Sequence, residues 1–165
     1  MPHRKRQTGA HLFSQLERGG KDPPEDFRFL DDFIRSGQSR QYELFIDGYN
    51  VLLRAHEKNL RSLHTNFTQI REQFIDAVAA KSGNFAKVWL VFDGVEDSSN
   101  ARANVQIIYT DRNEKSADEV IIQRINAKKG RKILLVTGDE GIISSVEARI
   151  FALIDVDDFY TFLGE

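Results

Sequence analysis

From residue 42 onward, short apolar runs alternate along the chain with stretches in which apolar residues recur every three or four positions. The continuous runs predict buried strands, and the helical spacing predicts amphipathic helices. Strands are expected at 42–46, 87–92, 105–109, 132–136 and 151–154. Helices are expected at about 50–54, 67–81, 116–128 and 141–148, with a last helical turn or two at 157–163. This alternation predicts an α/β domain with a central, mostly parallel sheet of about five strands, flanked by helices on both faces.

Residues 1–40 do not follow this rhythm. Gly19-Gly20 and Pro23-Pro24 interrupt any periodicity, and the first residues are polar and basic. The apolar positions between Phe27 and Ile34 predict one short amphipathic helix that docks on the domain. We therefore expect an N-terminal extension, partly flexible, over 1–40 and a single domain over 41–165.

Composition narrows the classes of function. The net charge is −2, with 23 Lys and Arg against 25 Asp and Glu, which disfavours a simple basic nucleic-acid-binding module. There are no cysteines, so disulfides and thiolate metal sites are excluded. No apolar run approaches the roughly 20 residues that span a bilayer, and no apolar segment follows the basic start. A cytoplasmic protein without a membrane partner is expected.

Aspartates follow three of the predicted strands. Asp47 ends the first, Asp93 the second and Asp139 the fourth, while Asp118 lies in the first turn of the helix after the third strand. Parallel strands place their carboxyl ends at one edge of a sheet, where ligands bind. We therefore expect these four acids to lie near one another.

Each acid also has a structural explanation. Asp-Gly pairs form turns, Asp139 could cap the following helix, and Ser116 with Glu119 matches a capping box. Turns do not require aspartate at every strand end, however, and clustered carboxylates are tolerated chiefly around a cation. Oxygen ligands without a histidine pair suit Mg²⁺ or Mn²⁺, which serve phosphate chemistry.

The order of these motifs resembles the NYN domain family, a PIN-like group of ribonucleases, and in particular its YacP-like branch. The resemblance covers roughly residues 42–160 and rests on Asp47-Gly48-Tyr49-Asn50-Val51, Val91-Phe92-Asp93-Gly94, Ser116-Ala117-Asp118-Glu119 and Thr137-Gly138-Asp139. It implies a three-layer PIN-like fold and Mg²⁺- or Mn²⁺-dependent endonucleolytic cleavage of RNA. It also implies that Asp47, Asp118 and Asp139 are metal ligands, Asp93 an active-site acid and Asn50 an associated polar residue.

Two positions depart from the family pattern. The second acid of the third motif is the longer Glu119, and Ile143 stands where some relatives carry a further acid. These departures leave a second hypothesis open, a catalytically weak or inactive RNA-binding or adaptor protein with the same fold. Haloacid-dehalogenase and receiver chemistry lack their required acids here, and no P-loop motif occurs.

RNA is the expected partner, and several residues are candidates for contact with it. Thr137 could hydrogen-bond a phosphate or Asp139, and Tyr49 could stack on an unpaired base or pack in the core. The basic candidates for backbone contact are Arg54, Arg102, Arg112 and Lys115, the last three flanking loops at the expected catalytic edge. The sequence leaves open whether the target is free RNA or RNA within a ribosome or another RNA–protein assembly, and it leaves the oligomeric state open.

Overall fold

A six-stranded sheet forms the centre of the molecule in the computed structural model, which describes residues 29–94, 98–111 and 113–164. The strand order is β3-β4-β2-β1-β5-β6. Five strands are parallel: β1 (Glu43–Asp47), β2 (Lys87–Gly94), β4 (Val105–Asp111), β5 (Ile133–Val136) and β6 (Ala152–Ile154). Strand β3 (Ser98–Arg102) pairs with β4 in the antiparallel direction. The predicted fold class is confirmed, with one strand more than expected.

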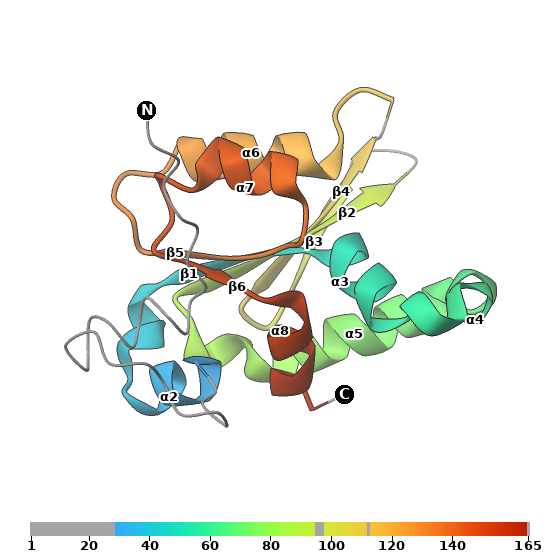
Figure 1. Cartoon of the computed structure of the whole chain (residues 1–165), viewed down its shortest axis with the longest axis horizontal. Helices are drawn as coiled ribbons and strands as arrows, with labels where there is room; N and C mark the ends of the chain where they lie inside the picture. Colours follow the sequence, from blue (N-terminus) through green and yellow to red (C-terminus); the bar gives the residue numbers. More distant parts are fainter. Residues whose placement is uncertain (1–28, 95–97, 112, 165) are drawn as a thin grey trace.

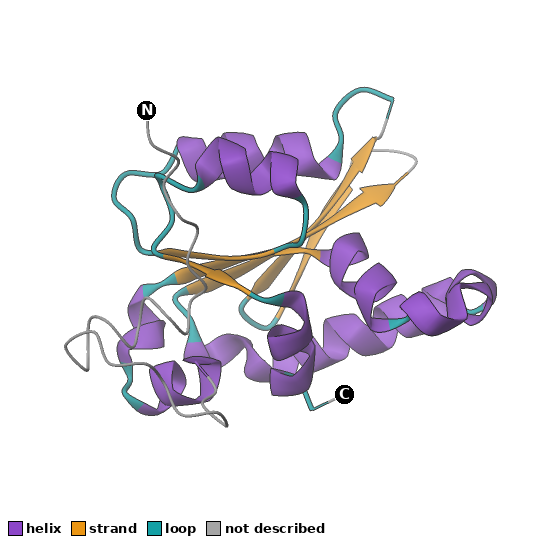
Figure 2. Cartoon of the chain, viewed as in Figure 1, coloured by secondary structure: helices purple, strands orange, loops and turns teal. Residues whose placement is uncertain are grey.

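Helices cover both faces of this sheet, which gives three layers (Figure 1, Figure 2). One face carries α6 (Ala117–Asn126) and α7 (Glu140–Val146). The other face carries α2 (Phe29–Arg35), α3 (Gly48–Ala55), α5 (Phe67–Lys81) and α8 (Val156–Phe162), and α4 (Leu60–Thr65) packs against α3 and α5. Short 3-10 turns lie at Gln38–Gln41, Glu57–Asn59 and Ser82–Asn84.

The side chains of β1 show how the sheet divides the core. Leu44 and Ile46 pack into the apolar cluster under α2, α3, α5 and α8, whereas Phe45 packs into the cluster under α6 and α7. Alternation along a strand directs successive side chains to opposite faces. Because β1 is buried on both faces, it reads as a continuous apolar run and ends at the polar edge with Asp47.

The short helix expected within 27–34 is confirmed by α2. Leu30 and Phe33 are buried in the core, and the Phe33 ring lies 5.0 Å from the ring of Tyr42 and 5.9 Å from that of Phe151. The rest of the expected extension, residues 1–28, lies outside the described residues. No helix in the described part of the chain is long and apolar enough to cross a membrane.

Strand β3 is the main departure from the expected elements. No strand was expected between residues 92 and 105, yet 98–102 forms a hairpin with β4. The strand Ser-Ser-Asn-Ala-Arg has no large apolar residue; residues 99–101 are exposed and Arg102 is half-buried, so the strand lacks the apolar signal on which the prediction depended. The hairpin carries the chain back from the carboxyl edge to the amino edge of the sheet, with Arg102 paired to Val105 at the start of β4.

Candidate active site

The topology of the sheet predicts a ligand-binding crevice at the centre of its carboxyl edge, between β1 and β5. After β1 the chain builds β2 and β4 on one side and then returns to add β5 on the other side. The point where the strand order reverses in this way is where α/β proteins bind ligands. Asp47 ends β1, and Asp139 follows β5, so the two acids flank the crevice.

One buried hydroxyl connects these two acids. The Thr137 hydroxyl donates to Oδ2 of Asp47 at 3.0 Å, and its oxygen accepts from the backbone N–H of Asp139 at 3.1 Å. Oδ1 of Asn50 accepts from the backbone N–H of Gly138 at 2.7 Å, which ties the start of α3 to the loop after β5. Thr137 is 2% exposed and its hydroxyl is already engaged, so it positions acids in this structure instead of offering a free hydroxyl to a phosphate.

Asp47 has a strongly perturbed carboxyl group. It is 9% exposed, and burial is the main cause that raises its pKa from 3.8 to about 6. The nearby carboxylates of Asp139 and Asp118 raise this pKa further, while the Thr137 hydroxyl and the backbone N–H of Asn50 oppose the rise. Asp139 and Asp118 therefore lie close enough to Asp47 for their charges to act on it.

Asp118 lies in the first turn of α6, whose start is fixed by two polar residues. The Ser116 Oγ accepts from the backbone N–H of Glu119 at 3.4 Å, so Ser116 caps α6 as expected. The Glu119 carboxylate accepts from the Ser116 hydroxyl at 3.3 Å, whereas in a capping box it accepts from the backbone N–H of the cap residue. Oδ1 of Asp93 accepts from the backbone N–H of Ala117 at 2.8 Å and from the Thr110 hydroxyl at 3.3 Å. Asp93 thus joins the end of β2 to the start of α6.

Asp139 caps the start of α7. Its Oδ1 accepts from the backbone N–H of Ile142 at 3.0 Å, which is the cap that the sequence allowed. Ile143, one turn further, is 3% exposed and packs in the apolar interior. The position at which some relatives carry a further acid is therefore part of the core in this chain.

The donor set matches a hard divalent cation in its chemistry, since it consists of carboxylates with no thiolate among them. Asp47 is buried, negatively charged above a pH of about 6, and near two more acids. In the described residues, no group of three His, Asp or Glu side chains is placed closely enough to hold an ion as it stands. The expectation that Asp47, Asp118 and Asp139 bind such an ion stays a prediction.

Arg54 and Tyr49 both lie on α3, beside the carboxyl edge. The Arg54 guanidinium bonds to Asp157 at 3.1 Å and to Glu57 at 3.0 Å, and it borders a cleft of about 580 Å³ together with Asn50, Leu60, Thr137 and Gly138. The half-buried Tyr49 ring makes an edge contact with Phe67 at 5.7 Å.

The other three basic residues proposed for contact with RNA do not all lie at the carboxyl edge. Arg102 was expected at the catalytic edge, and that placement is wrong, because β3 carries it to the amino edge, where it pairs with Asp76 at 2.7 Å and Glu72 at 3.2 Å. Arg112 lies outside the described residues. Lys115 precedes α6 at the carboxyl edge and donates to the Gln123 side chain at 2.6 Å.

Two arginines that were not sequence candidates lie against aromatic rings. Arg71 lies over the rings of Phe67 and Tyr109, and its buried Nε has no hydrogen-bond partner among the described residues. Arg124 lies over the ring of Trp89. Helical spacing in α5 relates Phe67 to Arg71, but the rings of Tyr109 and Trp89 come from strands far along the chain, so only the fold brings these groups together.

Comparison with known proteins agrees with this geometry. The sequence model of the YacP-like NYN domain family matches residues 44–161 of this chain. The chain belongs to the YacP-like NYN domain family. This match confirms the resemblance that the motifs indicated, and the family is a PIN-like nuclease family, which supports a ribonuclease-type function.

Solved structures show the same fold. The chain is similar to the crystal structure of a mutant form of Rae1 (YacP) from Bacillus subtilis, with 22% identity, a TM-score of 0.61, and coverage of 75% of this chain and 76% of that chain. A second Rae1 (YacP) crystal structure from Bacillus subtilis gives 22% identity, a TM-score of 0.56, and coverage of 73% and 72%. A comparison with the sequences of curated proteins gives no match.

Proposed function

We propose that this NYN-domain protein is a metal-dependent endoribonuclease, in which Asp47, Asp118 and Asp139 hold Mg²⁺ or Mn²⁺ at the carboxyl edge of the sheet. The observation that carries the proposal is the buried Asp47 carboxyl at the central crevice, perturbed by burial and by the two other acids. A carboxylate kept in such surroundings is costly unless a cation or another partner compensates it.

The residues of the chain have separate tasks in this proposal. A bound cation would orient a water molecule and stabilise charge on the phosphoryl oxygens. Thr137 and Asn50 hold the loop after β5 against the end of β1, which sets the separation of Asp47 and Asp139. Asp93 fixes the first turn of α6 and thereby positions Asp118. Tyr49, Arg54 and Lys115 surround this edge and are the proposed contacts to RNA.

The test is cleavage of an end-labelled single-stranded RNA by the full chain with Mn²⁺, with Mg²⁺, or with excess chelator. Asp47→Asn, Asp118→Asn and Asp139→Asn should each lower the cleavage rate by more than about 100-fold, because each removes a ligand charge. Asparagine at 139 can still accept the helix-capping bond from Ile142, so the fold is retained. The matched control is Asp76→Asn, which removes an exposed carboxylate on α5 and should leave the rate unchanged. Cleavage that persists unchanged in chelator would refute metal dependence.

A second candidate function is RNA binding without cleavage, in an adaptor that keeps the fold. The buried Ile143, in place of a further acid, and the absence of a ready-made ion-binding group among the described residues both favour it. RNA binding without cleavage in Mn²⁺, together with thermal melts that Mn²⁺ does not shift, would support this alternative. A melt raised by Mn²⁺ in wild type, and raised much less in Asp118→Asn, would support the nuclease.

A further inference from the structure

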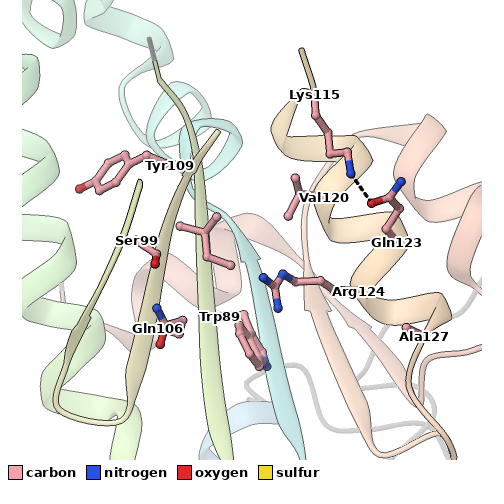
Figure 3. Close-up of a pocket in the computed structure, with 10 residues that line it drawn as sticks. Trp89, Ser99, Gln106, Tyr109, Lys115, Val120, Gln123, Arg124 and Ala127 are labelled. Carbon is pink, nitrogen blue, oxygen red and sulfur yellow. Dashed lines mark hydrogen bonds between the residues drawn. The ribbon is translucent and has the colours of Figure 1, made fainter. Parts of the chain in front are cut away.

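A groove of about 890 Å³ lies between α6 and the β2-β4-β3 side of the sheet, on the face that α6 and α7 cover elsewhere (Figure 3). Val120, Gln123, Arg124 and Ala127 form its helical wall. These positions are three or four residues apart, so they share one face of α6. The strands contribute Trp89, Ser99 and Gln106, whereas the ring of Tyr109 points away from the groove in Figure 3.

Three cations surround the Trp89 ring. The charged nitrogens of Lys87 and Lys128 lie 4.7 and 5.1 Å from the ring centroid, and the guanidinium carbon of Arg124 lies 4.9 Å from it. The ring also stacks on Phe45 at 5.8 Å, and its Nε1 donates to Glu43 at 2.9 Å. Trp89 is only partly buried, so this arrangement joins an aromatic surface to concentrated positive charge.

This positive charge is incompletely compensated. Lys128 pairs with Glu43 at 3.1 Å, but Lys87 and Arg124 form no ion pair within the described part of the chain. The ammonium group of Lys115, at the far end of the groove, bonds within the described part of the chain only to the neutral side chain of Gln123. Like charges gathered around one ring repel one another, in a chain whose net charge is −2. An anionic ligand would relieve that repulsion.

One end of the groove, at Lys115, lies near the candidate active site. Lys115 stands just before the first turn of α6, beside the bond from Ala117 to Asp93. From there α6 runs back across the sheet for 10 residues, about 15 Å, toward Trp89 and Ala127. An RNA strand that passed the acids at the carboxyl edge could continue along the α6 side of the groove without leaving the protein surface.

We propose that this groove binds the single-stranded segment of RNA that flanks the cleavage site, an inference that rests on the proposed nuclease function. Lys115 and Arg124 contact phosphates, and an unpaired base stacks against Trp89 or the guanidinium over it. Base–aromatic stacking in a cationic groove is the usual physics of single-strand binding. Duplex RNA is recognised instead by its shape across the minor groove, so single-stranded RNA should be preferred.

Trp89 supplies a direct readout, because it is the one tryptophan of the chain. Titration of the full chain with an unlabelled single-stranded RNA oligomer, in chelator to prevent metal-dependent cleavage, should quench its fluorescence. The same sequence annealed into a duplex should quench it much less. Binding of the oligomer, seen by anisotropy of a label on the RNA, without any change in Trp89 emission would overturn the proposal.

Charge-removal variants give a second, independent measurement. Arg124→Gln combined with Lys115→Gln should weaken single-strand binding about tenfold at 0.15 M salt and lower the slope of log affinity against log salt by about 1.4. The matched control, Arg40→Gln with Arg149→Gln, removes two exposed charges that do not line the groove and should change neither value. Equal effects of the two pairs would refute a specific groove.

The outcomes separate this inference from the proposed function. Quenching of Trp89 and a charge effect confined to the groove, without cleavage in Mn²⁺, would refute the nuclease but retain the groove. Metal-dependent cleavage with neither quenching nor a groove-specific charge effect would refute the groove but retain the nuclease.

Discussion

At the scale of single residues, Gly48 shows why the Asp-Gly pair after β1 is needed. A Cβ at this position would lie 2.4–2.8 Å from three atoms of the Phe92 ring, so the glycine is required by close packing and not by a turn. Gly48→Ala should lower the free energy of unfolding by about 1–3 kcal/mol. Gly83→Ala, where a Cβ meets nothing within 4 Å, should change it by no more than about 0.5 kcal/mol. Urea unfolding measures both, and equal values would contradict the packing argument.

Asp47 should make the stability of the metal-free protein depend on pH. Its folded-state pKa is raised from 3.8 to about 6, so between these values the folded state binds more protons than the unfolded state. The free energy of unfolding therefore falls by about 3 kcal/mol as the pH rises through this window. Asp47→Asn removes this loss of stability, and the asparagine oxygen can still accept the hydrogen bond from Thr137.

Urea unfolding in chelator at pH 4 and pH 7 measures this effect. The variant should be more stable than wild type at pH 7 and no more stable at pH 4. A difference between variant and wild type that does not vary with pH would contradict the raised pKa.

The sequence predicted which acids would share an edge but not what each would do there. The position of Asp47 after an apolar strand is visible in the sequence, because strand ends are local features. Its contact with Thr137 cannot be read from the sequence, because the two residues are 90 positions apart. Arg71 and Arg124 were missed for the same reason, since their ring partners Tyr109 and Trp89 come from distant strands.

At the scale of elements, Asp93 can be tested as the residue that holds the start of α6. Asp93→Asn keeps an oxygen that can accept from Ala117 and Thr110, so stability and RNA cleavage should both be retained. Asp93→Ala leaves the Ala117 N–H without this acceptor and should lower the free energy of unfolding by about 1–3 kcal/mol. Thermal melts and a cleavage assay measure the pair. Loss of cleavage in a stable Asp93→Asn protein would instead support the active-site acid that the family resemblance implies.

Elements with a strong apolar period were predicted well. The helix expected at 67–81 is α5 with the same bounds, because Phe74, Ile75 and Val78 bury one face of it. Strand β3 was missed because its hydrogen bonds to β4, and not an apolar pattern, place it in the sheet. That error also moved Arg102 to the wrong edge. An edge strand paired on one side can be polar along its whole length, so a period-two pattern does not reveal it.

At the scale of the whole molecule, the start of the folded unit can be located by deletion. Removing residues 1–24 should preserve a cooperative thermal melt, because that segment is polar and interrupted by Gly-Gly and Pro-Pro. Removing residues 1–36 also takes away Leu30 and Phe33, which are 4% and 0% exposed, and should lower the melting temperature strongly. Loss of the cooperative melt in the shorter deletion would show that the expected extension contributes to the core.

The crevice between β1 and β5 has a consequence for synthesis of the protein. The bonds that close it, from Thr137 to Asp47 and from Gly138 to Asn50, join residues 90 and 88 positions apart. A nascent chain that has reached only β4 already carries the Asp-Gly-Tyr-Asn motif, but nothing yet occupies the far side of β1. The site comes into existence only when β5 has been made and has docked. A fragment that stops before β5 contains the motif but lacks the assembled site.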